Sequence, residues 1–305
     1  MKHTNISRLL VLTLTLLFAG RSAWSEAGQF IPLQKQIDEA MARGENRLRL
    51  PKGRLLVDTS GIVVRNATNF TLEGSGKETV LVCTNPSVGF FAFFNCAKIA
   101  VKNLSVDYDP LPFTQATVVS VSPDHLFFEY EIHAGFPLLT PFYALKTAYF
   151  FDPKTRYWKR HVPDVYLVSN TILSPTRGQL YRPTRPRNIV FDYSDIVPGD
   201  LVAFCNRIPA AFVFRGSESV RLEDVEVLGA GGGALCRNMR GENYFRFNIR
   251  RGPRPAGASQ DRLMASSADG FNYAVAPKGP ILERCDFSYM GDDSVNFHGS
   301  ILPVM

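Results

Sequence analysis

The feature that most constrains the fold is a short alternation of apolar and polar residues that recurs along the chain, each time after a polar turn. In an extended strand successive side chains point to opposite sides, so this alternation directs every second side chain inward. Its clearest copies cover residues 63–74, 94–107, 214–227 and 279–287. Phe70 and Ile99, in the first two copies, are 29 residues apart, which is close to one coil of a solenoid. The pattern therefore predicts an all-β fold wound as a parallel β-helix.

A short amphipathic helix is predicted just ahead of these strands. Between Leu33 and Met41 the apolar residues recur at helical spacing, and Arg43-Gly44 provides the glycine that commonly ends a helix. A helix in this place suits a cap over the open end of a β-helix, where it would cover free sheet edges and apolar interior. We therefore predict an N-terminal capping helix.

The alternating pattern disappears between residues 111 and 206. Pro-rich turns and longer alternating strands replace it, and residues 196–204 resemble the tight turn and closing strand of a small β-barrel. We predict an inserted antiparallel, β-barrel-like domain over 111–206, between β-helix coils over 26–110 and 207–305. A solenoid that stops directly after its most polar motif would leave a coil uncovered. We therefore expect the β-helix to be truncated at its C-terminal end.

The first 25 residues have the features of a secretory signal peptide. Lys2 and Arg8 give a positive start, residues 9–18 are uncharged and largely apolar, and residues 23–25 offer small side chains for cleavage before Glu26. A bilayer span needs roughly 20 apolar residues, so this run is too short for a stable membrane anchor. We predict cleavage after residue 25 and an exported protein, periplasmic or extracellular.

Charge and cysteine content limit the partners. The formal charge is +6, but Lys2, Arg8 and Arg21 supply three of these charges, which leaves about +3 after cleavage. A nucleic-acid partner is therefore not expected, and the Arg-rich stretch 237–262 is interpreted as a solvated loop rather than a site for an acidic polymer. The five cysteines are odd in number and show no metal-ligand spacing. We predict neither a cysteine metal site nor a disulfide framework.

The most informative residues form a repeated motif near the end of the chain. Asp-x-apolar-Asn-aromatic occurs at residues 269–273 and again at 293–297, an offset of 24 residues. Equivalent positions on neighbouring coils stack about 4.8 Å apart. Asp269 and Asp293 are therefore predicted to lie one above the other, while Asp292 is displaced along its strand and projects differently.

Stacked carboxylates are suited to acid–base chemistry. Two that lie close together cannot both stay ionised without cost, so one pKa should rise. A protonated carboxyl beside an ionised one is the pair that glycoside hydrolysis uses. Stacked or diagonal positions can reach the spacing of inverting or of retaining enzymes, so the offset alone does not fix the stereochemistry.

Other interpretations of these residues remain open. Gly-Asp-Asp also occurs in ordinary turns, and adjacent aspartates can bind Ca²⁺. Asn272 and Asn296 are candidate substrate ligands, although a structural amide stack inside the coil is favoured. His298 is a candidate sugar ligand or proton carrier, a role that a single histidine usually does not have. Asp107 and Asp109, where the insert departs, are predicted to stabilise a turn.

Four segments together resemble glycoside hydrolase family 110. They are residues 107–118 (DYDPLPFTQATV), 198–200 (PGD), 266–271 (SSADGF) and 283–299 (ERCDFSYMGDDSVNFHG). The resemblance implies a right-handed parallel β-helix with a β-barrel insert, and an exo-acting α-1,3-galactosidase that inverts and needs neither metal nor cofactor. Its catalytic set falls on Asp269, Asp292 and Asp293, and its partner would be a glycan. Asn272 stands where histidine is expected, which leaves the exact sugar open.

Two further functions are compatible with the predicted architecture. One is a pectate-lyase-like polysaccharide lyase, in which the aspartates hold Ca²⁺ and an Arg or Lys is the base. The other is a non-catalytic β-helix that binds carbohydrate or lies at a surface, since a fold does not by itself imply an activity.

Overall fold

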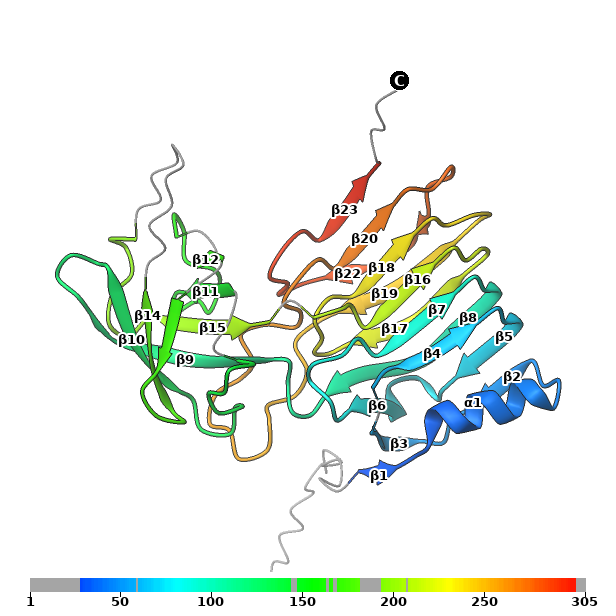
Figure 1. The fold of residues 1–305 in the computed structure, drawn as a ribbon, viewed down its shortest axis with the longest axis horizontal. Coiled ribbons are helices and arrows are strands. Elements are labelled where there is room, and N and C mark those ends of the chain that lie inside the picture. Colours follow the sequence, from blue (N-terminus) through cyan, green and yellow to red (C-terminus); the bar gives the residue numbers. More distant parts are fainter. Residues whose placement is uncertain are drawn as a thin grey trace, which may run out of the picture.

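The computed structural model describes one helix and a predominantly β chain (Figure 1). The predicted signal peptide, 1–25, lies outside the described residues. Within the described part, no helix is long and apolar enough to cross a membrane. The described residues are 28–58, 60–143, 147–162, 165–166, 169–181, 193–206 and 208–299.

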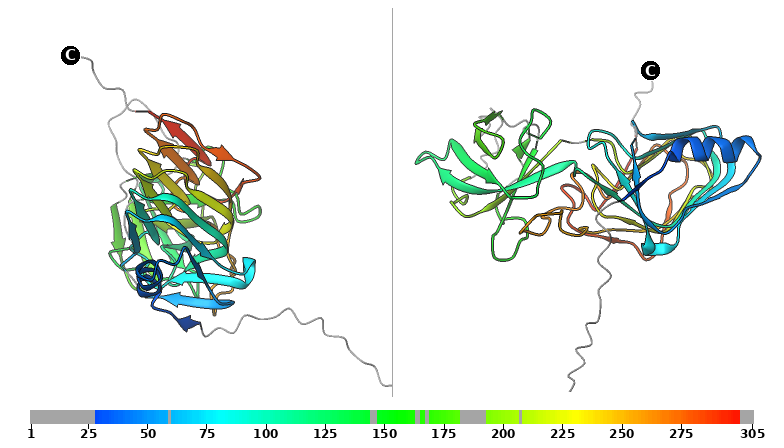
Figure 2. Two further views of the ribbon diagram at one scale, coloured as in Figure 1. Left: turned by 90° about the vertical axis from the view of Figure 1, so that its right-hand side faces the viewer. Right: turned by 90° about the horizontal axis from the view of Figure 1, so that it is seen from below.

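Two parallel sheets make up the region that we call the parallel region, residues 28–109 and 208–299. The ten-stranded sheet contains β1 (Gln29–Phe30), β2 (Arg47–Arg49), β3 (Gly53–Val57), β5 (Thr68–Glu73), β6 (Thr79–Cys83), β8 (Ala97–Tyr108), β17 (Arg221–Val227), β19 (Tyr244–Ile249), β21 (Ile281–Leu282) and β22 (Asp286–Phe287). The six-stranded sheet contains β4 (Ile62–Arg65), β7 (Phe91–Phe94), β16 (Phe212–Arg215), β18 (Ala234–Arg237), β20 (Phe271–Ala274) and β23 (Val295–His298). From β16 onward the chain passes alternately from one sheet to the other, so successive passes stack (Figure 2).

The first three recurring stretches each prove to be two strands in different sheets, joined at a corner, whereas 279–287 holds β21 and β22 of the ten-stranded sheet. The corner residue after β4, β7 and β18 is asparagine with φ near 54°, at Asn66, Asn95 and Asn238. Asparagine tolerates this left-handed conformation better than most residues, because its short side chain bonds locally. The predicted register is confirmed, since Phe70 on β5 pairs with Ile99 on β8.

The interior of the parallel region is a ladder of aromatic and aliphatic side chains. Phe91 stacks on Phe212 with ring centroids 5.3 Å apart, and Phe93 stacks on Phe214 at 5.0 Å. Such pairs contribute beyond their buried area, about 0.5–1.5 kcal/mol each. None of the five cysteines, all among the described residues, forms a disulfide, and four of them are buried. They act as small apolar side chains in the described core.

The predicted helix is α1 (Leu33–Ala42), followed by Gly44 with φ of 74°. Its apolar stripe, Leu33, Ile37 and Ala40, is buried in the same core as the strands of the parallel region. Figure 1 shows α1 at the end of the stack that also holds β1 and β2. A 3₁₀ turn, η1 (Gly76–Glu78), leads into β6.

A third sheet lies between β8 and β16 in the sequence, and we call residues 111–206 the insert. Its strands pair antiparallel in the order β12-β11-β15-β9-β10-β14-β13. It has a core of its own, to which Leu263 and Met264 of the parallel region also belong. Its strands are β9 (Phe113–Val121), β10 (Phe127–Ile132), β11 (Thr147–Phe151), β12 (Val165–Tyr166), β13 (Ser169–Ile172), β14 (Arg177–Tyr181) and β15 (Leu201–Cys205). The exact domain boundaries stay a prediction.

Candidate active site

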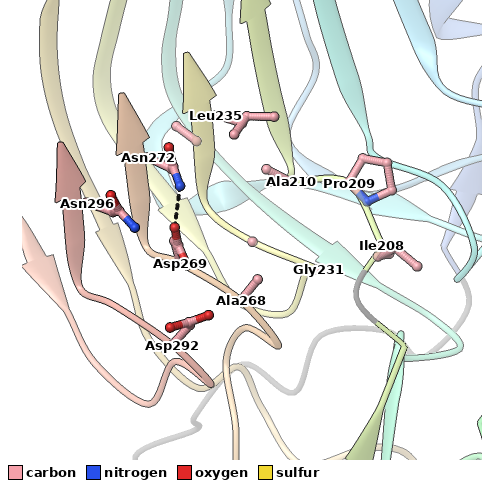
Figure 3. Close-up of a pocket in the computed structure, with 12 residues that line it drawn as sticks. Ile208, Pro209, Ala210, Gly231, Leu235, Ala268, Asp269, Asn272, Asp292 and Asn296 are labelled. Atoms are coloured by element: carbon pink, nitrogen blue, oxygen red, sulfur yellow. Dashed lines mark hydrogen bonds between the residues drawn. The ribbon is translucent and has the colours of Figure 1, made fainter. Parts of the chain in front are cut away.

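The repeated motif lies on neighbouring strands in the predicted register. On β20 and β23, Asn272 pairs with Asn296, so the offset is the 24 residues expected from the sequence. The amide of Gly270 donates to the carbonyl of Asp293 at 2.8 Å, which continues the ladder back to the aspartates. The winding of the chain therefore stacks the two copies of the motif (Figure 3).

The three predicted catalytic carboxylates lie together. One oxygen from each of Asp269, Asp292 and Asp293 lies within 4.8 Å of the others. Asp269 and Asp292 are half-buried, whereas Asp293 is exposed. The backbone amide of Asp293 donates to Oδ1 of Asp292 at 3.0 Å, which fixes the orientation of that carboxylate. This arrangement places three acidic groups at one point on the surface of the six-stranded sheet.

Asp269 and Asp292 face a pocket of about 390 Å³ (Figure 3). Small residues shape much of its wall, so the backbone is accessible there. The remaining lining residues are Ile208, Pro209, Ala210, Gly231, Gly232, Ala234, Leu235, Ala268, Asn272 and Asn296. A cavity of this size is in the range of small-molecule and single-sugar sites.

Each asparagine of the motif is bonded to the aspartate three residues before it. Nδ2 of Asn272 donates to Oδ2 of Asp269, and Nδ2 of Asn296 donates to Oδ2 of Asp293 at 3.0 Å. The asparagines therefore orient carboxylates and also line the pocket. Oδ1 of Asn272 is buried and has no hydrogen-bond partner among the described residues.

The structure does not bring His298 to the pocket. It lies at the end of β23, is exposed, and is paired in register with Ala274. Nothing in its described surroundings connects it with the carboxylates, so its predicted role as a sugar ligand or proton carrier stays a prediction.

The segment that leads to Asp269 is held by the insert, a contact that the sequence did not indicate. The side chain of Gln115 on β9 is fully buried. Its Oε1 accepts a hydrogen bond from the amide of Leu263 at 2.8 Å. Its Nε2 donates to the carbonyl of Asp261 at 2.9 Å. Nε2 of Gln115 also lies 3.0 Å from Nδ1 of His133. Since Nε2 of Gln115 is a donor, Nδ1 of His133 must accept, and its ring is neutral.

A buried ion pair fixes the same segment to β8. Arg262 is 4% exposed, and its two terminal nitrogens donate to Asp107 at 2.7 and 2.9 Å. The prediction of a solvated loop over 237–262 is therefore wrong for Arg262, because its guanidinium has a carboxylate partner in the interior. Asp107 also accepts from the amide of Tyr108, but both residues lie within β8, so the predicted turn role of Asp107 is wrong. Asp109 instead pairs with Arg54.

Aromatic residues of the insert contact the loop that carries Asp292. A Cβ on Gly291 would lie 2.9 Å from the ring of Tyr149, so only glycine fits without a shift. Tyr157 stacks on Tyr289 with centroids 6.3 Å apart, and Arg251 lies 3.8 Å over the same Tyr289 ring. The glycine of Gly-Asp-Asp is the one sequence signal of this contact, since a close approach of the backbone requires it.

The same three carboxylates are also a plausible donor set for a cation. Ca²⁺ binds oxygen ligands at about 2.3–2.6 Å, so two ligands of one ion lie at most about 5 Å apart. Carboxylate oxygens within 4.8 Å satisfy that limit. The geometry therefore permits either acid–base chemistry or metal binding.

The chain is similar to bacterial enzymes that carry the name α-1,3-galactosidase B. It is 22% identical over 312 residues to that of Bacteroides thetaiotaomicron, covering 90% of this chain and 48% of the relative. It is 27% identical over 264 residues to those of two Bacteroides fragilis strains, covering 80% of this chain and 41% of each relative. The chain thus spans about half the length of the curated relatives it matches. No family model matches the chain.

Among solved structures, the chain is similar to the Gp54 tailspike of Acinetobacter baumannii bacteriophage AP22, determined in complex with A. baumannii capsular saccharide. The match is 11% identical, covers 85% of this chain and 44% of the tailspike, and has a TM-score of 0.20. A likeness at that score supports no conclusion about fold or ligand.

Proposed function

We propose that this chain carries the site of an exo-acting glycoside hydrolase that removes terminal α-linked galactose from glycans. We also propose that the parallel region is a right-handed β-helix and that the protein is exported, periplasmic or extracellular. The observation that carries the proposal is the cluster of Asp269, Asp292 and Asp293 at a pocket of about 390 Å³. The distant relatives named α-1,3-galactosidase B support a hydrolase of this kind.

The proposed reaction needs two of the three carboxyl groups in different states. One, protonated, gives its proton to the glycosidic oxygen as that bond breaks. Another, ionised, either removes a proton from the attacking water or attacks the sugar directly. Asp269 and Asp292 line the pocket, so the sugar would lie against them.

Inversion is the stereochemical outcome that the resemblance to family 110 implies, and we propose it on that basis. Inverting carboxyl groups usually lie about 6.5–9.5 Å apart, which leaves room for water, and retaining ones lie about 5–5.5 Å apart. Oxygens within 4.8 Å are nearer to the retaining spacing. The anomer of the product is therefore the most informative measurement on this part of the proposal.

The experiment incubates the chain with an aryl α-galactoside and with an α-1,3-linked galactose disaccharide, and follows the product by proton NMR. We expect galactose to be released, with β-galactose appearing first if the reaction inverts. Release of α-galactose first would contradict inversion and leave hydrolysis intact. No release from either substrate would contradict the proposed hydrolase.

A calcium-dependent lyase is the second candidate, and one observation favours it. Three carboxylate oxygens within 4.8 Å fit a Ca²⁺ site, and an arginine or a lysine would be the base. This function predicts an unsaturated, ultraviolet-absorbing product from an acidic polysaccharide and complete loss of activity with a chelator. The hydrolase predicts turnover that a chelator does not change.

A further inference from the structure

The outer face of the six-stranded sheet carries a row of cations that continues from the candidate site. The last residues of its strands lie in register, and their side chains alternate with the buried aromatic ladder. From β4 to β23 the row is Arg65, Phe94, Arg215, Arg237, Ala274 and His298. It contains three arginines and no acidic residue.

Two of these arginines have no carboxylate partner in the part of the chain that the structure describes. Arg215 is exposed and makes no ion pair there, and Arg237 donates only to the backbone carbonyls of Cys236 at 2.8 Å and Asn272 at 3.5 Å. Arg65 differs, because its guanidinium stacks 4.3 Å over the ring of Phe94. Arg215 and Arg237 are register partners on neighbouring strands, so their charges lie side by side.

Elsewhere the arginines and lysines of the parallel region are mostly neutralised. On the outer face of the ten-stranded sheet, Glu223 pairs with Lys102 and Arg221, and Glu226 pairs with Arg250. The second pocket, of about 530 Å³, also contains cations, but each of its four is within ion-pair distance of a carboxylate. Those pairs are Arg54–Asp109, Lys77–Glu226, Arg254–Asp261 and Arg262–Asp107.

The unpaired arginines lie next to the pocket of the candidate site. Leu235 lines that pocket, and Arg237 follows it by two residues on the same strand, so both side chains project from the same face about 7 Å apart. Asn272, whose carbonyl Arg237 contacts, holds the carboxylate of Asp269 through its side chain. Burial and the charge of Arg215 lower the pKa of Arg237, whereas Asp269 acts in the opposite direction.

We propose that Arg215 and Arg237 bind an anionic group of the substrate, a sulfate ester or a carboxylate on the glycan whose terminal sugar lies at Asp269 and Asp292. The planar guanidinium donates two parallel hydrogen bonds to such groups, and it remains charged at any pH of interest. Two adjacent cations without a counter-charge repel each other, and a bound anion removes that repulsion. This inference rests on the proposed action on glycans and specifies the class, which is an acidic galactan.

Binding by calorimetry tests the inference without requiring turnover. The probes are a sulfated galactan tetrasaccharide, the same tetrasaccharide after desulfation, a galacturonate tetrasaccharide, inorganic sulfate, and a single-stranded oligonucleotide of matched charge. We expect at least one anionic sugar to bind about 10-fold or more tightly than the neutral one, and this preference to shrink as salt is raised. The affinities for the galacturonate and the sulfated tetrasaccharides, compared with each other, show whether a carboxylate or a sulfate ester is preferred.

The double variant R215Q/R237Q should abolish the preference and leave affinity for the desulfated sugar within about twofold. The matched control is R240Q/R284Q, which removes two exposed arginines that already have carboxylate partners, Glu218 and Glu283. The control should keep the preference.

Any of four results would overturn the inference. They are equal affinity for charged and neutral sugars, a preference that survives R215Q/R237Q, a preference equally lost in the control, and binding of inorganic sulfate or the oligonucleotide as tightly as the sulfated glycan. If the chain binds the acidic sugars through these arginines but releases no galactose, this inference stands and the proposed hydrolase is contradicted.

Discussion

The parallel region and the insert contribute to the candidate site in different ways. In the parallel region, neighbouring strands come from successive coils, and the 24-residue offset of Asp269 and Asp293 is enough to stack them. In the insert, the contacts that matter join residues far apart in sequence, such as Gln115 with Leu263, 148 residues away. The two regions meet at the segment that leads to Asp269.

The two regions therefore have different roles in the site: the parallel region supplies the reactive groups, and the insert positions them. The three carboxylates all come from the parallel region, so a repeated coil supplies the reactive groups. The insert supplies none of them, but Gln115 bonds the backbone before Asp269 and Tyr149 packs against Gly291 before Asp292. We infer that the coil brings the acidic groups together and the insert holds the two loops that bear them.

The largest stability effect is expected at the ion pair that anchors the shared segment. Arg262→Met leaves Asp107 charged and buried without its partner, which costs about 3–5 kcal/mol of unfolding free energy. The double variant R262M/D107L should recover most of that loss, because both charges are then absent. Denaturant unfolding followed by far-ultraviolet circular dichroism measures both.

Arg254→Met is the matched control, since Arg254 is in the same stretch and pairs with Asp261 at the surface. We expect less than about 1 kcal/mol for this variant. Equal losses for Arg262→Met and Arg254→Met would show that the buried pair has no special weight in anchoring this segment to β8.

A smaller stability effect, with a clear effect on catalysis, is expected at Gln115. Gln115→Ala leaves the amide of Leu263 and the ring of His133 without their partner, which costs about 1–3 kcal/mol. A shift of the following segment would displace Asp269, so kcat should fall roughly 10- to 100-fold while KM changes little. Gln179→Ala, on β14 of the insert, is the control and should leave kcat unchanged.

The sequence predicted what depends on periodicity. The 29-residue spacing of Phe70 and Ile99 and the 24-residue offset of the aspartates are visible because parallel coils repeat a pattern, and both registers are present in the structure. The helix over Leu33–Met41 was also predicted from a period, the helical spacing of its apolar residues.

Contacts made by the insert, or between residues that the insert separates in sequence, could not be predicted in this way. Arg262 was interpreted as solvated because its neighbours in sequence are polar, and its partner Asp107 lies 155 residues away. The packing of the insert against the parallel region leaves no period in the sequence, and neither Gln115 nor Tyr149 is distinguished by its neighbours. Gly291 is the one residue type in these contacts that a close approach of the backbone explains, and the sequence alone did not show what approaches it.

The smallest effect is a pH dependence confined to the insert. Burial, together with the charge of Arg156, lowers the pKa of His133 from 6.5 to about 4. The unfolded chain therefore binds this proton more readily, so stability is complete above about pH 6.5 and declines as pH falls toward 4. His133→Gln should flatten this decline, and His298→Gln in the parallel region should not.

Fluorescence of Trp158 measures this effect in the insert, because it stacks on Tyr149 at 5.3 Å. Trp158 is the single tryptophan after residue 25, so the chain without the predicted signal peptide contains no other. If the wild-type unfolding midpoint were independent of pH between 7 and 4.5, the assignment of His133 as a buried neutral histidine would be wrong.

The most direct test of the central claim is the turnover of an aryl α-galactoside by Asp269→Asn, Asp292→Asn and Asp293→Asn, with circular dichroism to verify the β fold. Each variant should lose about 10²–10⁴-fold or more in kcat, because an amide can neither give nor take the proton. Asp286→Asn, an exposed aspartate on β22, should turn over like the wild type. Near wild-type turnover in all three site variants would contradict the account.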